Sequence, residues 1–128
     1  MIAAGDSCAV KFALSPGQAG DAPEGCSLLM TVGTISACCA MIMDKAYEGD
    51  ETKNLAAKLG FSPVVPPKSS RKEPWAHDKY LYKKRNEIER LFRRLKGFRR
   101  VFTRFDKLDR MFMGFVVLAL IVIAIKQC

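Results

Sequence analysis

Four polar side chains on one predicted helix could act together in this sequence. They are spaced three, four and seven residues apart along the chain: Tyr82, Arg85, Glu89 and Lys96. An α-helix turns by about 100° per residue, so these side chains are expected to lie within roughly 60° of one another. Arg93 and Arg100 extend the same polar edge. A carboxylate surrounded by cations and a phenol suits a group that faces phosphate and metal, and this chemistry needs a second acid from elsewhere in the chain.

Asp44 is the candidate for the second acid. It ends a continuous apolar run over residues 36–43, which predicts a strand buried on both faces of a sheet. An acid at the carboxyl end of a central strand lies where open α/β sheets bind their ligands. Alternatively, Asp44 is a cap for the helix that follows. Asp6, at the tip of a predicted hairpin, fits turn chemistry better than catalysis.

The helix that carries the four polar residues is predicted over about residues 78–100. This stretch has no proline, one glycine near its end and many residues that favour helix. A helix start is also predicted at Asp21. Gly60 is expected to end the helix predicted over about residues 50–59. The other predicted elements are a hairpin over about residues 1–14, a strand over about 36–43, a helix over about 50–59, a short strand over 61–65 and a buried apolar helix over about 109–125.

The positive charge of the chain is concentrated in one region. Between Lys79 and Arg110 there are 13 basic and 4 acidic residues, a local net charge of +9, whereas the whole chain carries +8. A run this lopsided in sign indicates a polyanionic partner, either nucleic acid or an anionic membrane. The alternative is a helix face that is merely solvated.

The five cysteines favour neither a zinc site nor a disulfide framework, because their number is odd and no C-x-x-C pair occurs. Cys38 and Cys39 lie in an apolar run and are expected to be reduced core residues. The N-terminal residues do not form a basic segment followed by an apolar one, so no secretory signal is indicated. A reducing cytoplasm fits these features.

Residues 111–125 form an unbroken apolar stretch before the C-terminus. As a helix, these residues would cover only about 22 Å, less than the roughly 30 Å hydrocarbon core of a bilayer. We therefore expect a fully buried terminal helix and no membrane partner.

Two patterns in the chain coincide in a known family. One is Asp44 to Tyr47 (DKAY) at the end of an apolar strand, and the other is the helix pattern Y-x2-R-x3-E-x6-K. Together they resemble the C-terminal part of the catalytic domain of a DDE-type bacterial insertion-sequence transposase. Further matches in the sequence are Phe12 to Asp21, the run Pro66-Pro67-Lys68, and Arg99 to Asp106.

The resemblance implies a ribonuclease H-like α/β fold, a mixed sheet with flanking helices, incomplete at the N-terminus because the first strand is missing. It implies that Asp44 and Glu89 are the second and third acids of a catalytic triad whose complete site binds two Mg²⁺ (or Mn²⁺) ions. The residues implied to contact DNA phosphates are Tyr82, Arg85, Arg93, Lys96 and Arg100. The first acid of the family and its DNA-binding region have no counterpart here, so we expect a truncated or split transposase, inactive alone.

The implied partners are the DNA of insertion-sequence ends and targets, and either an upstream-frame polypeptide or a second transposase subunit. The implied location is the bacterial cytoplasm, at the nucleoid. Two other functions fit the sequence. A noncatalytic DNA-binding regulator of transposition would keep the basic helix without a metal site, and a tail-anchored membrane protein would place a polybasic segment before an apolar C-terminus.

Overall fold

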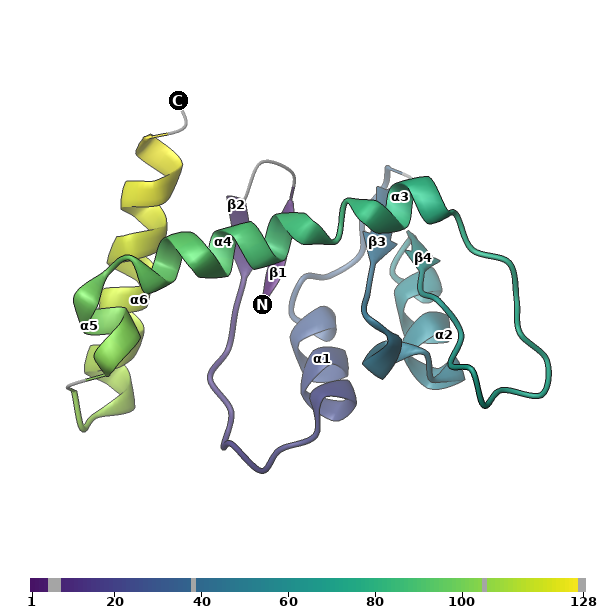
Figure 1. Ribbon diagram of the computed structural model, residues 1–128, viewed down its shortest axis with the longest axis horizontal. Helices are drawn as coiled ribbons and strands as arrows, with labels where there is room; N and C mark the ends of the chain where they lie inside the picture. The colour runs from purple at the N-terminus through teal and green to yellow at the C-terminus, as the bar shows by residue number, and fades with distance from the viewer. Residues whose placement is uncertain (5–7, 38, 105, 127–128) are drawn as a thin grey trace. The chain divides into compact units, whose positions relative to one another are not determined.

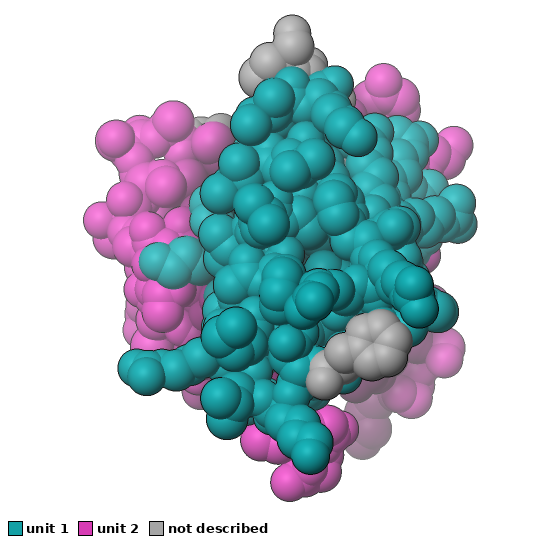
Figure 2. Space-filling view, turned by 90° about the vertical axis from the view of Figure 1, so that its left-hand side faces the viewer, with its two compact units in different colours: residues 1–14, 86–128 teal, residues 15–85 magenta. Residues whose placement is uncertain are grey.

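The computed structural model describes residues 1–4, 8–37, 39–104 and 106–126. The chain divides into two compact units, one made of residues 1–14 with 86–128 and the other of residues 15–85 (Figure 2). Each unit holds its own two-stranded sheet and its own helices. The architecture is therefore mixed α/β, as expected. The ribonuclease H-like arrangement stays a prediction because the two sheets belong to different units.

The unit of residues 15–85 is built around two parallel strands that lie side by side (Figure 1). The strands are β3 (Cys39–Ile42) and β4 (Phe61–Val64), joined through the 3₁₀ turn η1 (Lys45–Tyr47) and helix α2 (Asp50–Lys58). A parallel pair needs such a crossover because a short turn cannot bring the second strand back in the same direction. Helix α1 (Asp21–Met30) packs against α2 and η1.

The core of this unit is small and lies between its helices and β4. The residues that are buried there are Leu29, Thr52, Ala56, Val64 and Val65. The strand β3 itself is only partly covered, with Cys39 and Ala40 exposed and Met41 and Ile42 half-buried. The expectation of a strand buried on both faces was therefore wrong, because α2 packs against β4 and leaves β3 partly uncovered. Cys39 is likewise not a core residue, and Cys38 lies outside the described residues.

Gly60 ends α2 as its sequence position predicted. Its φ of +91° lies in the region that favours glycine, and a Cβ there would come within 2.5 Å of the carbonyl oxygen of Ile35. The chain can therefore turn from α2 into β4 only because this position carries no side chain. The neighbouring backbone N–H of Ile35 donates to the carbonyl of Leu59 at 3.0 Å, which fastens the same corner.

The unit of residues 1–14 and 86–128 begins with an antiparallel hairpin of β1 (Ile2–Ala4) and β2 (Cys8–Lys11), as predicted. The predicted turn at residues 5–7, with Asp6, lies outside the described residues. Three helices complete the unit: α4 (Asn86–Lys96), α5 (Arg99–Thr103) and α6 (Asp109–Ile125). Its core consists of Leu91 and Leu95 from α4 with Ala119 and Ile123 from α6.

The single helix predicted over residues 78–100 was wrong. The structure has α3 (Lys79–Lys83), a turn at residues 84–85, then α4 and α5. The breaks fall next to Asn86 and at Gly97, and both residue types are poor helix formers: asparagine competes for backbone hydrogen bonds and glycine loses more backbone entropy. The break beside Asn86 also coincides with the boundary between the two units.

The terminal helix α6 agrees with its predicted bounds but is not fully buried. Val116, Ala119 and Ile123 face the core, whereas Leu118 and Ile121 are 56 % and 50 % exposed. The reason is geometric: the core of this unit touches α6 on one side, and an apolar sequence buries only the side that has a partner. Within the described part of the chain, no helix combines the length and the apolar character that a membrane crossing requires.

Candidate functional site

Asp44 stands at the end of β3, and its local geometry combines both roles considered for it. The backbone of Met43 still donates to Val64 of β4 at 3.1 Å, so the sheet reaches the residue before Asp44. Asp44 is then the N-cap of η1, where its Oδ1 accepts the backbone N–H of Lys45 at 2.6 Å. Its side chain remains 57 % exposed. The cap fixes the carboxylate in position and leaves it accessible from solvent.

Two of the residues predicted for the site meet this carboxylate. The hydroxyl of Tyr82 donates to Oδ1 of Asp44 at 3.5 Å, and Nη1 of Arg85 lies 3.4 Å from the same oxygen. The guanidinium of Arg85 is also 5.4 Å from the centre of the Tyr82 ring. A phenol and a cation therefore meet at one oxygen atom of an acid, as the sequence suggested. The acid is Asp44, whereas the helix pattern had grouped Tyr82 and Arg85 with Glu89.

Helix α3 and the turn after it present Tyr82 and Arg85 to Asp44. The helix starts at Asp78, whose Oδ1 accepts the backbone N–H groups of Tyr80 at 2.8 Å and Leu81 at 3.0 Å. It ends in a turn in which the N–H of Arg85 donates to the carbonyl of Tyr82 at 3.1 Å. Because α3 stops there, Arg85 belongs to the turn and to the same unit as Asp44.

The other predicted site residues lie in the second unit. Glu89, Arg93 and Lys96 are exposed on α4, whereas Leu91 and Leu95 on its other side are buried. At about 100° per residue the three polar side chains fall within roughly 60° of one another, so this part of the predicted face holds. The face predicted from Tyr82 to Lys96 as one surface does not exist as a continuous helix, because the turn at residues 84–85 interrupts it.

Arg100 lies on α5, and its guanidinium stacks on the ring of Phe115 at 4.6 Å. Its Nη1 is 3.9 Å from Oδ1 of Asp106, a weak contact at the limit of an ion pair. The other oxygen of Asp106 is buried and has no hydrogen-bond partner among the residues that the structure describes. The cation of Arg100 is thus held at the surface of its unit by an aromatic ring and a partly satisfied carboxylate.

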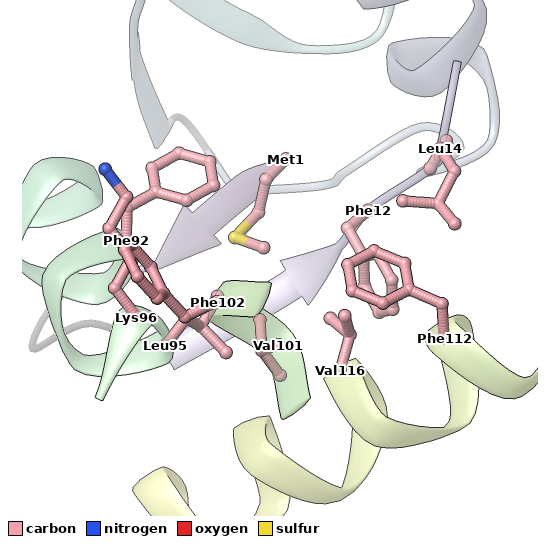
Figure 3. Close-up of a pocket in the computed structure, with 11 residues that line it drawn as sticks. Met1, Phe12, Leu14, Phe92, Leu95, Lys96, Val101, Phe102, Phe112 and Val116 are labelled. Carbon is pink, nitrogen blue, oxygen red and sulfur yellow. The ribbon is translucent and has the colours of Figure 1, made fainter. Parts of the chain in front are cut away.

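A pocket of about 350 Å³ opens beside Lys96 in this unit (Figure 3). Apart from Lys96, its lining is apolar and includes Phe12, Leu14, Phe92, Phe102, Phe112 and Val116. Mg²⁺ needs several oxygen ligands, and the side chains of this lining offer none, since its one polar side chain is the ammonium of Lys96. The pocket is therefore not the site that the sequence predicted, and Lys96 is exposed beside it.

A second phenol, that of Tyr47, lies near Asp44. Burial, together with the negative charges of Asp21 and Asp44, raises the pKa of Tyr47 above its usual value. Tyr47 ends η1, three residues after Asp44, and its ring packs so closely on α1 that a Cβ at Gly25 would overlap it. This packing couples the turn that carries Asp44 to the core of the unit.

Asp44 fits one requirement of a magnesium ligand, because it is an accessible carboxylate oxygen donor with a fixed backbone. A single carboxylate beside a guanidinium does not make a complete metal cage. Among the described residues, no group of three or more Asp, Glu, His or Cys side chains is arranged to hold a metal ion. The carboxylate of Asp44 thus has the chemistry of a single metal ligand, and its described neighbours Tyr82 and Arg85 are not metal-binding carboxylates.

The profile of the transposase DDE domain family matches residues 2–124. The chain belongs to this family of transposases. DDE transposases generally use divalent metal ions and have DNA as their partner. The resemblance of the two sequence patterns to this family is thereby confirmed.

A protein of Brucella ovis named "Putative transposase for insertion sequence element IS6501" is 35 % identical to this transposase over 106 residues. The alignment covers 82 % of this chain and 79 % of the Brucella protein. No solved structure matches the chain.

Sequence reasoning found the residues around Asp44 but grouped them differently. It placed Tyr82 and Arg85 with Glu89 because it assumed one continuous helix, and Asn86 was the available sign of a break. It gave Trp75 no role beyond packing or loop structure, whereas in the structure Lys53 and Arg71 both lie over its ring. The spacing of those three residues carries no periodic signal, so only the folded chain reveals their contact.

Proposed function

We propose that this transposase takes part in the cleavage and transfer of DNA strands at insertion-sequence ends. Asp44 and Glu89 are the proposed catalytic acids and ligands of Mg²⁺ (or Mn²⁺). The single observation that carries the proposal is the convergence of Tyr82 and Arg85 on Asp44, in a chain whose family is a transposase family.

The reaction requires in-line attack of water or a 3′-hydroxyl on a phosphodiester. When bound, divalent ions lower the pKa of the nucleophile and stabilise the leaving oxygen. The chain itself contributes two kinds of group: carboxylate oxygens, which suit hard metal cations, and N–H or O–H donors, which bind phosphate. The acid at position 44 is supported by its exposed side chain and by the backbone N–H of Lys45, which fixes one oxygen.

Arg85 is the proposed phosphate contact beside Asp44. Its guanidinium is a planar fork of N–H donors that matches phosphate oxygens, and its Nη1 lies 3.4 Å from Oδ1 of Asp44. A phosphate bound by Arg85 would therefore lie next to the proposed catalytic acid. The phenol of Tyr82, beneath the same guanidinium, can orient a phosphate oxygen or the attacking hydroxyl.

The proposed phosphate contacts in the other unit are Arg93 and Lys96 of α4 and Arg100 of α5. All three are exposed, and the region around them carries most of the positive charge of the chain. Lys96 would act as a mobile point charge and the arginines as forks. Exposed cations of one sign attract the DNA backbone irrespective of its sequence.

A transposition assay in bacteria tests the proposal, with a marked copy of the insertion sequence that encodes this chain. We expect Asp44→Asn and Glu89→Gln each to lower transposition by at least about 100-fold, because loss of a catalytic group costs several kcal/mol of transition-state stabilisation. Glu51→Gln, an exposed acid on α2, is the matched control and should transpose normally. Undiminished transposition by Glu89→Gln would remove that residue from the mechanism.

A noncatalytic DNA-binding regulator is the second candidate. It is favoured by the exposed cations of α4 together with the lack of a three-acid metal group among the described residues. Such a protein would bind DNA equally well with and without Mg²⁺, and Asp44→Asn would leave both its binding and its effect on transposition unchanged.

A further inference from the structure

Trp75 is the chain's single tryptophan and lies in the connector of residues 65–78, the long loop between β4 and α3 (Figure 1). Two cations lie over its ring: Nζ of Lys53 is 3.3 Å from the ring centre and Cζ of Arg71 is 4.5 Å from it. Its indole N–H donates to the carbonyl of Val65 at 2.8 Å. The half-buried indole therefore joins the connector to α2 through Lys53. It also links two ends of the connector, because its N–H bonds Val65, the first residue of that loop.

Asp50, in the first turn of α2, holds both of these cations in place. Nη2 of Arg71 lies 2.8 Å and 2.9 Å from its two carboxylate oxygens, and Nζ of Lys53 lies 3.1 Å from one of them. Glu48 adds a second attachment, since it accepts the backbone N–H of Lys68 at 2.7 Å. The connector is thus fastened to the N-terminal end of α2 at several points.

The connector leads directly to the groups that face Asp44. Trp75 lies three residues before Asp78, the cap of α3, and the ring of His77 packs edge-on against Tyr82 at 5.6 Å between ring centres. The Trp75 ring is thus attached to α2, the backbone of residues 75–77 follows it, and the ring of His77 contacts Tyr82.

Helix α3 needs an external anchor. It is only five residues long, far below the length at which a helix is stable in isolation. Its contacts with Asp44, at 3.5 Å from Tyr82 and 3.4 Å from Arg85, are long and exposed, and such contacts contribute little alone. The indole, with two cations over its ring and its N–H bonded to the carbonyl of a buried residue, is the stronger attachment on this side of α3.

We propose that Trp75 is a positioning residue: clamped by Lys53 and Arg71, it fixes the connector so that α3 keeps Tyr82 and Arg85 against Asp44. The positioning role deepens the proposed function of Asp44, Tyr82 and Arg85 and rests on it. Trp75 itself touches no reacting group in this assignment.

The test uses the full chain and reads the geometry spectroscopically, without catalysis. Tryptophan fluorescence reports the clamp, and the NMR signals of the Arg85 side chain report its contact with Asp44, with Asp44→Asn as the reference for loss of that contact. We expect Trp75→Ala to move the Arg85 signals most of the way to their positions in Asp44→Asn. Trp75→Phe keeps a ring for the two cations and should restore most of the wild-type positions.

Arg71→Met tests the clamp with the indole in place, and Lys72→Met is the matched control because the exposed Lys72 is the adjacent cation of the connector. Arg71→Met should shift both the tryptophan emission and the Arg85 signals, whereas Lys72→Met should shift neither. Unchanged Arg85 signals in folded Trp75→Ala and in Arg71→Met would overturn the positioning role. Shifted Arg85 signals together with normal transposition by Asp44→Asn would instead refute the proposed function and support the positioning role.

Discussion

Individual residues in this transposase are fixed by short-range geometry more than by burial. Asp44 is exposed, yet its Oδ1 is held by a backbone N–H and faces Tyr82 and Arg85. Gly60 is the opposite case, since nothing but hydrogen is tolerated where its Cβ would point. In the unit of residues 15–85, Asp44 follows the end of β3 and Gly60 follows the end of α2. Substitutions at either position are therefore expected to shift the backbone near the candidate site.

Gly60→Ala is expected to destabilise the protein by about 1–3 kcal/mol, because a residue with a Cβ is strained at positive φ. The approach to the carbonyl of Ile35 adds a steric cost. Gly17→Ala is the matched control, since a Cβ at Gly17 would meet nothing within 4 Å. Urea unfolding of the two variants measures the difference, and equal stabilities would contradict the role assigned to Gly60.

The carboxylates that anchor the connector predict a dependence of stability on pH. The backbone N–H of Lys68 lowers the pKa of Glu48 from its usual 4.5, and hydrogen bonds from Lys53 and Arg71 lower the pKa of Asp50 from its usual 3.8. A carboxyl group with a depressed pKa in the folded state stabilises the fold above its unfolded-state pKa, and this contribution is lost as the pH falls through the folded-state value.

Stability should therefore decline as the pH falls below 4.5, and it should decline less steeply in the double variant Glu48→Gln with Asp50→Asn. Unfolding by urea at a series of pH values between neutral and strongly acidic provides the comparison. Parallel curves for the variant and the wild type would show that these two carboxylates do not contribute to the acid sensitivity.

At the scale of elements, α4 and α6 of the unit of residues 1–14 and 86–128 differ in how their apolar residues are distributed around the helix. Helix α4 is strongly amphipathic: Leu91 and Leu95 are buried, and charged residues cover its other faces. Helix α6 is apolar almost throughout but buries only one side. Amphipathic sequence indicates which face of a helix is inside, whereas a uniformly apolar sequence leaves that choice to the packing.

Replacement of one leucine on each helix compares the stability contributed by a buried position on α4 with that of an exposed position on α6. Leu91→Ala should cost about 2–5 kcal/mol of stability because Leu91 is fully buried and its loss leaves a cavity. Leu118→Ala on α6 removes the same atoms from a position that is 56 % exposed, and its effect should stay within about 0.5 kcal/mol. Thermal or urea unfolding measures both, and a comparable loss in Leu118→Ala would mean that the exposed side of α6 is covered in solution.

At the scale of the whole molecule, the family match at residues 2–124 spans both units. The chain starts in one unit, forms the other over residues 15–85 and returns to the first. The candidate residues follow this division, with Asp44, Tyr82 and Arg85 in one unit and Glu89, Arg93, Lys96 and Arg100 in the other. The local excess of positive charge begins in α3 and continues through α5.

This charge distribution predicts DNA binding that weakens steeply with salt. The reason is that lysine and arginine side chains, when they bind phosphates, release the counterions condensed on the DNA. Replacement of both Arg93 and Lys96 by glutamine should reduce the slope of log affinity against log salt by about 2, one for each lost phosphate contact. Lys58→Gln, in the last turn of α2, is the control and should leave the slope unchanged. Duplex titrations over a range of salt concentrations test this, and an affinity independent of salt would refute it.

Much of the chain could be predicted from its sequence, because the signals involved are local. The hairpin, α2 with its glycine stop, β4 and the bounds of α6 follow from periodicity and turn residues, and the transposase family follows from residue types at fixed spacing. The break next to Asn86 was missed because helix propensity on both sides outweighs a single asparagine, and burial of β3 and α6 was overestimated because an apolar sequence does not state how many partners it has.

The sequence by itself determined which residue types were available for phosphate chemistry, and it determined the two patterns that identify the family. Only the tertiary structure decided that Tyr82 and Arg85 face Asp44 and that Lys53 and Arg71 lie over the ring of Trp75. The physical reason is that most of these contacts join residues distant in the chain, such as Asp44 with Tyr82 and Lys53 with Trp75. Their formation depends on where α3 ends and how its connector is fastened, and neither is encoded in a local period.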